Sequence, residues 1–199
     1  MARSKNTLLK GASGKIGDIV TFERNGTQVI REYVVPKDPM KCGVVNKGLS
    51  PLKNEIKRGH IGNRKAYRSA ISNAMKNCIV GKYPNLSLDY SLIQIAEGKI
   101  QLPQNISVDI DNNHNRVNLS WNIDLEFPDK PGRPDDKLNV VYFNEKFSVA
   151  KLLLSAPARS DGKACLSLTD NWEIADTHIW VYMTSYSLLH NSDSLYLKL

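Results

Sequence analysis

The sequence predicts a mainly β protein in which a basic module with a β-hairpin and helices, residues 1–101, precedes a β-sandwich, residues 102–199. In the second half, short alternating segments recur about every ten residues. In the first half, an Asn-Gly pair flanked by β-branched and aromatic residues marks a hairpin. Charge also divides the chain, because residues 1–100 hold 18 Lys and Arg against 7 Asp and Glu, whereas the remainder holds 9 against 13. This layout is typical of a binding or assembly protein.

Length and composition fit a folded globular protein. The 199 residues suffice for one large domain or two small ones, and 41% hydrophobic with 24% charged residues argues against disorder. No apolar stretch approaches the roughly 18 residues of a membrane span, and residues 1–17 lack the apolar core of a signal peptide. We therefore expect synthesis and folding in the cytoplasm. Cys42, Cys78 and Cys165 have neither a disulfide nor a metal-ligand spacing, so we expect reduced, mostly buried thiols.

A hairpin is predicted over residues 18–34. Asn25-Gly26 is the preferred pair for a two-residue type I′ turn, because both positions need φ > 0. An isolated hairpin is barely stable in water, so this one must pack on another sheet or on a partner subunit. The residues predicted to bind that partner are Phe22, Asn25, Gly26, Val29, Ile30, Arg31 and Tyr33.

The glycine-rich segment before the hairpin, residues 10–17, superficially resembles a phosphate-binding loop. Such a loop needs Ser or Thr after its lysine and an apolar strand before it. Here Ile16 follows Lys15, and residues 4–9 make a poor strand. The segment is therefore interpreted as a turn whose glycines permit positive φ.

Helical structure is predicted over residues 50–80, after an extended connection over 35–48. Ser50 offers an N-cap with Pro51 at the first helical position, and Gly81 a C-cap. The helical stretch is broken, with pieces at 52–57 and 63–80. An apolar stripe with a 3.6-residue period supports the second piece. Its members are Ala66, Ala70, Ile71, Ala74, Met75 and Cys78.

Basic side chains on this helical segment allow two interpretations. They form either a solvated or subunit-facing helix face, or a nucleic-acid contact that uses clustered positive charge. No helix-turn-helix spacing, zinc pattern or aromatic-glycine RNA-binding signature accompanies them. The nucleic-acid candidates are Arg58, Arg64, Lys65 and Arg68.

Seven short strands separated by turn residues predict an immunoglobulin-like or fibronectin type III-like sandwich in the second half. In the second strand, Val117, Leu119 and Trp121 alternate with polar residues, which indicates one buried face. The predicted strands are 106–110, 116–122, 138–144, 151–155, 164–168, 178–187 and 194–199.

The sixth of these strands has two contrasting faces. Ile179, Val181 and Met183 form an aliphatic row. The other row, which is aromatic, contains His178, Trp180, Tyr182, Thr184 and Tyr186. Trp180, Tyr182 and Tyr186 are either a surface that binds a partner or carbohydrate, or part of the core with the aliphatic row facing out.

The pattern from residue 102 to 199 resembles fibronectin type III domains. The resemblance is carried by Trp121 on the second strand, the tyrosines of the sixth strand, and the closing strand after Asn191-Ser192-Asp193-Ser194. The lack of a cysteine pair between the sheets also suits that type. The resemblance implies a module that binds or spaces.

The whole chain also resembles an uncharacterised family of roughly 200-residue proteins from Bacteroidota and their mobile elements. The departure from that family lies at residues 36–49, where members carry an Asn-Pro-x-Thr-x-x-Gln segment and an arginine-rich helix. Similar hairpin starts occur in small phage and prophage proteins, which implies a virion or assembly component. The matching residues are 14–17, 25–26, 29–31, 81–84, 89–91, 97–98, 119–121, 159–162 and 192–196.

No catalytic motif stands out, so we expect a protein that is not an enzyme and binds no cofactor or metal. The acidic pair Asp135-Asp136 is typical of a solvated turn, and no Gly-x-Ser-x-Gly elbow presents a nucleophile. Cys165 has no activating neighbour. The histidines His114, His178 and His190 are too dispersed to define a metal site.

The predicted function is therefore a non-enzymatic structural subunit of a multiprotein particle, with a phage or prophage virion as the leading choice. The partners expected are protein subunits in a homo- or hetero-oligomer, and the chain is expected in the virion or its assembly. The alternatives are a nucleic-acid-associated basic protein and a surface or carbohydrate-binding module.

Overall fold

The computed structural model describes residues 2–3, 12–33, 39–123, 131–153, 156–169 and 171–199. The chain forms two compact units, Met1–Pro39 and Met40–Leu199. The predicted boundary at residue 101 lies inside the second unit, because the helices share a hydrophobic core with the sandwich. The predicted mainly β fold with an N-terminal hairpin and a few helices is confirmed, and every sheet pairing is antiparallel in the described chain.

The first unit is a small sheet in the order β1-β4-β3-β2. Its strands are β1 (Ala2–Arg3), β2 (Gly14–Ile16), β3 (Ile19–Arg24) and β4 (Thr27–Glu32). The predicted hairpin is the β3–β4 pair, and its turn residues Asn25 and Gly26 have φ of 51° and 71°, as a type I′ turn requires. The segment interpreted as a turn contributes strand β2, while Lys10 and Gly11 lie outside the described residues, as does Val34 at the end of the predicted hairpin.

The second unit begins with helices α1 (Pro39–Leu49), α2 (Lys53–Gly59) and α3 (Ala66–Asn77). The prediction of an extended connection over 35–48 is wrong for its described part, residues 39–48, because that stretch is helical. The glycines of α1 and its weak periodicity hide the helix, but Val45 and Leu49 are fully buried one turn apart, and this packing overrides propensity.

A second correction concerns the end of the predicted helical stretch. Ile79 and Val80 belong to strand β5 (Ile79–Lys82), which pairs with β6 (Asn85–Leu88). Gly81 lies in β5 and caps no helix. A 3₁₀ turn, η2 (Tyr90–Leu92), follows, and Asp89 caps it by accepting a hydrogen bond from the Ser91 amide at 3.0 Å.

The predicted seven-stranded sandwich is present. One sheet has the order β10-β9-β12-β13 and the other the order β11-β8-β7. Each predicted strand is found within a few residues of its expected position. The observed strands are β7 (Ser107–Asp111), β8 (Arg116–Ser120), β9 (Lys137–Asn144), β10 (Val149–Leu152), β11 (Lys163–Ser167), β12 (Thr177–Thr184) and β13 (Leu195–Leu197). Two further 3₁₀ turns, η3 (Arg159–Asp161) and η4 (Ile174–Asp176), lie in the connections.

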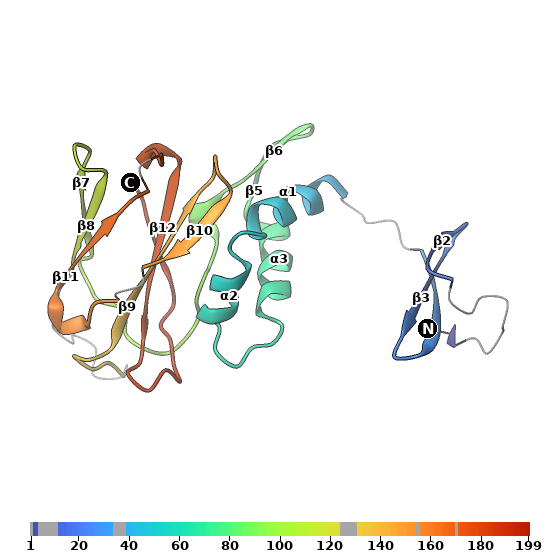
Figure 1. Ribbon diagram of the computed structural model, residues 1–199, viewed down its shortest axis with the longest axis horizontal. Helices are drawn as coiled ribbons and strands as arrows, with labels where there is room; N and C mark the ends of the chain where they lie inside the picture. The colour runs from blue at the N-terminus through green and yellow to red at the C-terminus, as the bar shows by residue number, and fades with distance from the viewer. Residues whose placement is uncertain (1, 4–11, 34–38, 124–130, 154–155, 170) are drawn as a thin grey trace. The chain divides into compact units, whose positions relative to one another are not determined.

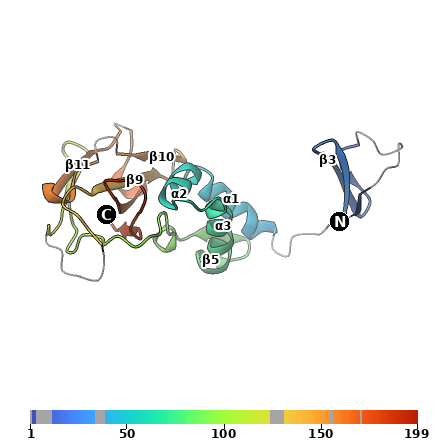
Figure 2. The same ribbon diagram turned by 90° about the horizontal axis from the view of Figure 1, so that it is seen from below.

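The larger sheet is buried on both faces, so the second unit has three layers. Alternate side chains of β9 and β12, such as Val140 and Val181, enter the core between the two sheets. The intervening side chains, such as Phe143 and Trp180, enter a second core with the helices. Figures 1 and 2 show α2 and α3 on the side of this sheet away from β7, β8 and β11. Within the described residues, no helix is long and apolar enough to cross a membrane.

Candidate functional site

The register of the N-terminal sheet divides the predicted partner-binding residues between its two faces. Residues directly opposite one another share a face, and the pairs are Val20 with Arg31 and Phe22 with Val29. Lys15 pairs with Val20 from the other side, so it joins the same face. We call this side the basic face. It carries Lys15, Val20, Phe22, Arg24, Thr27, Val29, Arg31 and Tyr33.

The opposite face is partly closed by the chain itself. The Thr21 hydroxyl and the Gln28 amide both donate hydrogen bonds to the Ala12 carbonyl, at 3.1 and 2.7 Å. Ile30 lies on this face, opposite Thr21. Of the predicted set, therefore, four residues share the basic face, Ile30 lies behind it, and Asn25 and Gly26 form the turn.

The four candidate nucleic-acid residues of the second unit lie around the connection from α2 to α3. Arg64, Lys65 and Arg68 are exposed. Arg58, in the last turn of α2, pairs with Glu55 at 2.9 Å and is therefore partly neutralised. These residues are neighbours in sequence. Lys53 of α2 also lies near this connection, with its ammonium 5.7 Å from the centroid of the Tyr67 ring.

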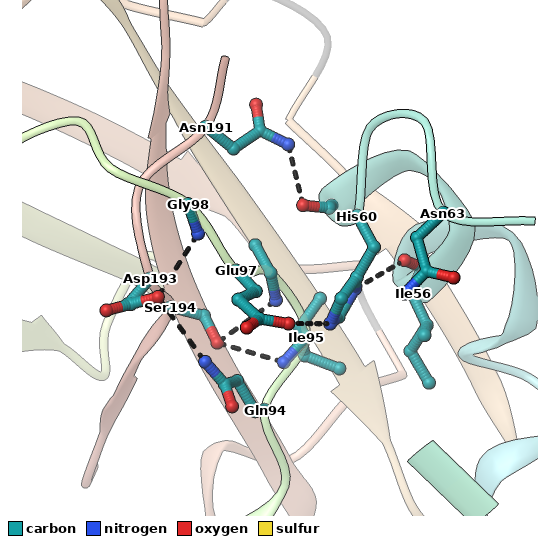
Figure 3. Close-up of polar contacts among 12 residues, drawn as sticks. Ile56, His60, Asn63, Gln94, Ile95, Glu97, Gly98, Asn191, Asp193 and Ser194 are labelled. Carbon is teal, nitrogen blue, oxygen red and sulfur yellow. Dashed lines mark hydrogen bonds and ion pairs between the residues drawn. The ribbon is translucent and has the colours of Figure 1, made fainter. Parts of the chain in front are cut away.

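A turn before β13 holds the end of α2 and the segment 94–98 in place (Figure 3). The Asn191 side-chain amide donates to the carbonyls of Arg58 and Gly59, at 3.2 and 2.7 Å. Ser194 accepts from the amides of Ile95 and Ala96 at 2.9 and 3.2 Å. These contacts fix the position at which the basic connection from α2 to α3 begins.

The alternative of a surface formed by the β12 aromatic row is wrong for two of its three residues. Trp180 and Tyr182 are fully buried beneath the helices, whereas Tyr186 beyond the strand is 68% exposed. Helices α1 to α3 cover this row, and the aliphatic row is buried as well, so the sheet has no exposed side here.

His178 lies in a cluster of aromatic rings at the edge of this core. Its ring centroid is 4.4 Å from that of Tyr90, and its Nδ1 is 2.9 Å from the Tyr196 hydroxyl. Its Nε2 lies 3.6 Å from a Glu145 carboxylate oxygen. Burial lowers the pKa of His178 below its usual value of 6.5, although Glu145, Asp89 and Asp176 oppose that shift.

The cluster contains the residue types of a proton relay, but the pKa values of its tyrosines are too high for proton transfer near neutral pH. Burial raises the pKa of Tyr90 to about 12, with Glu145 contributing, and burial also raises the pKa of Tyr196. Both phenols therefore stay protonated near neutral pH and act as hydrogen-bonding groups, not as nucleophiles or bases. A pocket of about 280 Å³ adjoins the cluster. Its lining is Val44, Lys47, Gly48, Leu86, Ser87, Leu88, Tyr90, Glu145 and Ser148.

The lowered pKa of His178 predicts a specific loss of stability in acid. The unfolded chain binds a proton near pH 6.5 more readily than the folded chain, so the free energy of unfolding falls as pH drops through that value. We expect a His178→Asn variant to lose less stability than the wild type between pH 7.5 and 5.5 in urea unfolding. The other three histidines are common to both proteins, and parallel pH curves would contradict the expectation.

A buried arginine links separate segments of the sandwich, and the sequence analysis did not predict this role. Arg159 is fully buried, and its Nη2 donates to the Gln101 carbonyl, while its own carbonyl accepts from the Trp121 indole at 2.9 Å. Burial lowers the pKa of Arg159, and the nearby Asp136 carboxylate opposes this shift without cancelling it. The prediction that Asp135-Asp136 is a solvated pair is wrong for Asp136, which is buried and accepts a hydrogen bond from the Arg133 amide at 2.8 Å.

The cysteines and acids form no recognisable catalytic arrangement in the part of the chain that the structure describes. Cys78 is buried, and burial raises the pKa of its thiol, which makes it less reactive. Cys165 is exposed on β11, contrary to the expectation of mostly buried thiols. No group of three or more His, Cys, Asp or Glu among the described residues could hold a metal ion.

A family model matches residues 35–198, which is nearly the whole second unit. The chain belongs to DUF6266, a family of unknown function. The prediction that the chain belongs to an uncharacterised family is thus confirmed. No curated protein matches this DUF6266 member. The N-terminal sheet, residues 12–33 with β1, lies outside the matched range.

Proposed function

We propose that the chain is a non-enzymatic structural subunit of a multiprotein assembly, with a phage or prophage virion as the particle. The observation that carries the proposal is the poor core of the N-terminal sheet. Among its described residues, Val29 is the only hydrophobic side chain that is buried. Ile16 and Tyr33 remain 53% and 37% exposed.

A unit this small needs additional stabilisation. Folded units below about 40 residues usually require disulfides, metals or association with another chain. The sequence has no cysteine before Cys42, so no disulfide can form within Met1–Pro39. No group of three or more His, Cys, Asp or Glu among its described residues could hold a metal ion. Docking onto a partner would supply the stability instead, because each exposed apolar side chain that becomes fully buried contributes roughly 1.5–3 kcal/mol.

The outer edge of the sheet supplies a means of docking. Strand β2 ends the order β1-β4-β3-β2, and all three of its residues are exposed. On its outer side, the backbone groups of β2 have no partner among the described residues, and they suit the addition of a strand from a neighbouring subunit. The sandwich then acts as the spacing or bridging module, the role that the resemblance to fibronectin type III domains implies. A source in Bacteroidota or their mobile elements belongs to the same proposal.

A charge placed on this edge should disrupt the assembly. We expect Ile16→Lys to reduce the mass of the purified full-length protein, measured by light scattering, from an oligomer or partner complex to the monomer. Lysine on an edge strand opposes strand addition. Leu189→Lys, which replaces another apolar side chain that is 64% exposed, should leave the mass unchanged. A monomeric wild type that captures no partner, or an Ile16→Lys protein with wild-type mass, would refute the proposal.

Nucleic-acid contact through the α2–α3 connection is the second proposal. The exposure of Arg64, Lys65 and Arg68 favours it. The carbohydrate alternative retains Tyr186 alone, because Trp180 and Tyr182 are buried.

A further inference from the structure

Charge is segregated across the N-terminal sheet. The basic face carries Lys15, Arg24 and Arg31, all exposed, and no carboxylate among its described side chains. The two acidic residues of the strands, Glu23 and Glu32, both lie on the opposite face. Only the basic face of the sheet therefore attracts an anionic partner.

Aromatic rings lie among these cations. The Lys15 ammonium is 3.7 Å from the centroid of the Tyr33 ring, and the Arg31 guanidinium is 5.7 Å from that of Phe22. Lys15 and Arg31 stand on either side of Val20 in one row across the sheet. Two strand spacings separate them, about 9–10 Å. Such a row suits a chain of repeated negative charges better than a single anion.

We propose that the basic face binds single-stranded nucleic acid, with Lys15, Arg24 and Arg31 contacting phosphates and the rings of Tyr33 and Phe22 stacking on bases. Grooves that combine cations with exposed rings bind single strands in this way, because every base offers a face for stacking. An acidic protein would use the cations and leave the rings without a role, and a duplex keeps its bases stacked on one another. The proposal uses the side chains of the basic face, whereas assembly uses the backbone of edge strand β2. Ile16, whose substitution tests assembly, lies on the opposite face, so the two proposals are tested by different variants.

The test is fluorescence anisotropy of labelled 20-nucleotide oligo-dT and oligo-U with the full-length protein. We expect Lys15→Gln/Arg31→Gln to weaken binding about tenfold or more and to reduce the salt slope by about 1.4, since each lost contact to a single strand removes about 0.7. Tyr33→Leu keeps the charge and should weaken binding about fivefold or more through lost stacking. The matched control, Lys163→Gln/Lys198→Gln, removes the same charge from exposed positions of the second unit that lie outside the α2–α3 connection, and it should change affinity less than about twofold.

Competition experiments distinguish single-stranded nucleic acid from an acidic protein and from a duplex. Polyglutamate of equal charge and a 20-base-pair duplex should each displace the labelled strand about tenfold less well than unlabelled oligo-dT. Binding of oligo-dT and oligo-U alike, or of one of them, supports the proposal and shows whether DNA, RNA or both are bound. It is overturned by the absence of binding at about 50 mM salt, by polyglutamate or duplex competing equally, or by the control variant losing as much affinity as Lys15→Gln/Arg31→Gln.

Discussion

Replacing Trp180 with alanine is expected to lower the free energy of unfolding by about 3–5 kcal/mol, the usual cost of removing a large buried aromatic side chain. Trp180 is fully buried between the central sheet and the helices, and its indole nitrogen donates to the Ile93 carbonyl at 3.0 Å. Its ring also packs edge-on against Tyr196, with centroids 5.5 Å apart. The substitution leaves a cavity and a buried carbonyl without its donor.

Tyr186→Ala provides the matched comparison, because this ring follows the same strand but is 68% exposed. Its effect should stay within about 0.5 kcal/mol, as for most surface substitutions. Urea unfolding followed by tryptophan fluorescence and by circular dichroism would measure both. Similar losses in the two variants would show that the helices do not cover the aromatic row in solution.

Gly98→Ala should destabilise the protein by about 3 kcal/mol or more, at the upper end of the cost of overpacking. A Cβ at this position would lie 1.8 Å from the carbonyl oxygen of Asn191 and 2.5 Å from its carbon. Both are backbone atoms, so no side-chain rotation relieves the overlap. The Gly98 amide also donates to Asp193 at 3.1 Å, and the required shift would break that bond (Figure 3).

Gly43→Ala is the matched control for the glycine prediction. Gly43 lies within α1, and no atom approaches its added Cβ within 4 Å. Because alanine favours a helix over glycine by about 1 kcal/mol, this variant should be slightly more stable than the wild type. Thermal and urea unfolding of the two variants should therefore move in opposite directions, and equal midpoints would contradict the close approach at Gly98.

Helices and strands were predicted well where their own residues carry a recognisable turn pair or periodicity. The Asn25-Gly26 turn and the alternating strands of the sandwich need only neighbouring residues to be recognised. Helix α1 could not be recognised in this way, because its glycines lower helix propensity and only burial of Val45 and Leu49 by distant segments explains it.

Sites that depend on contacts between distant segments were beyond local patterns. From the sequence, the aromatic row of β12 could have been placed either on the surface or in the core. Periodicity shows that a strand has two faces, but it does not show what covers each face. Arg159 resembles an ordinary loop arginine until its contacts with Gln101 and Trp121 are known. On the N-terminal sheet, by contrast, the cations and rings were visible in sequence, and a register read from the turn would have placed them on one face.

The turn at residues 191–194 also has a consequence for how the protein is made. Its side chains hold backbone groups that precede them by 95 to 133 positions, from Arg58 to Gly98. During translation, the end of α2 and the segment after η2 emerge from the ribosome long before the residues that secure them. The second unit therefore completes its structure late, and a nascent chain stalled before residue 191 exposes the helix-facing side of the central sheet to chaperones and proteases.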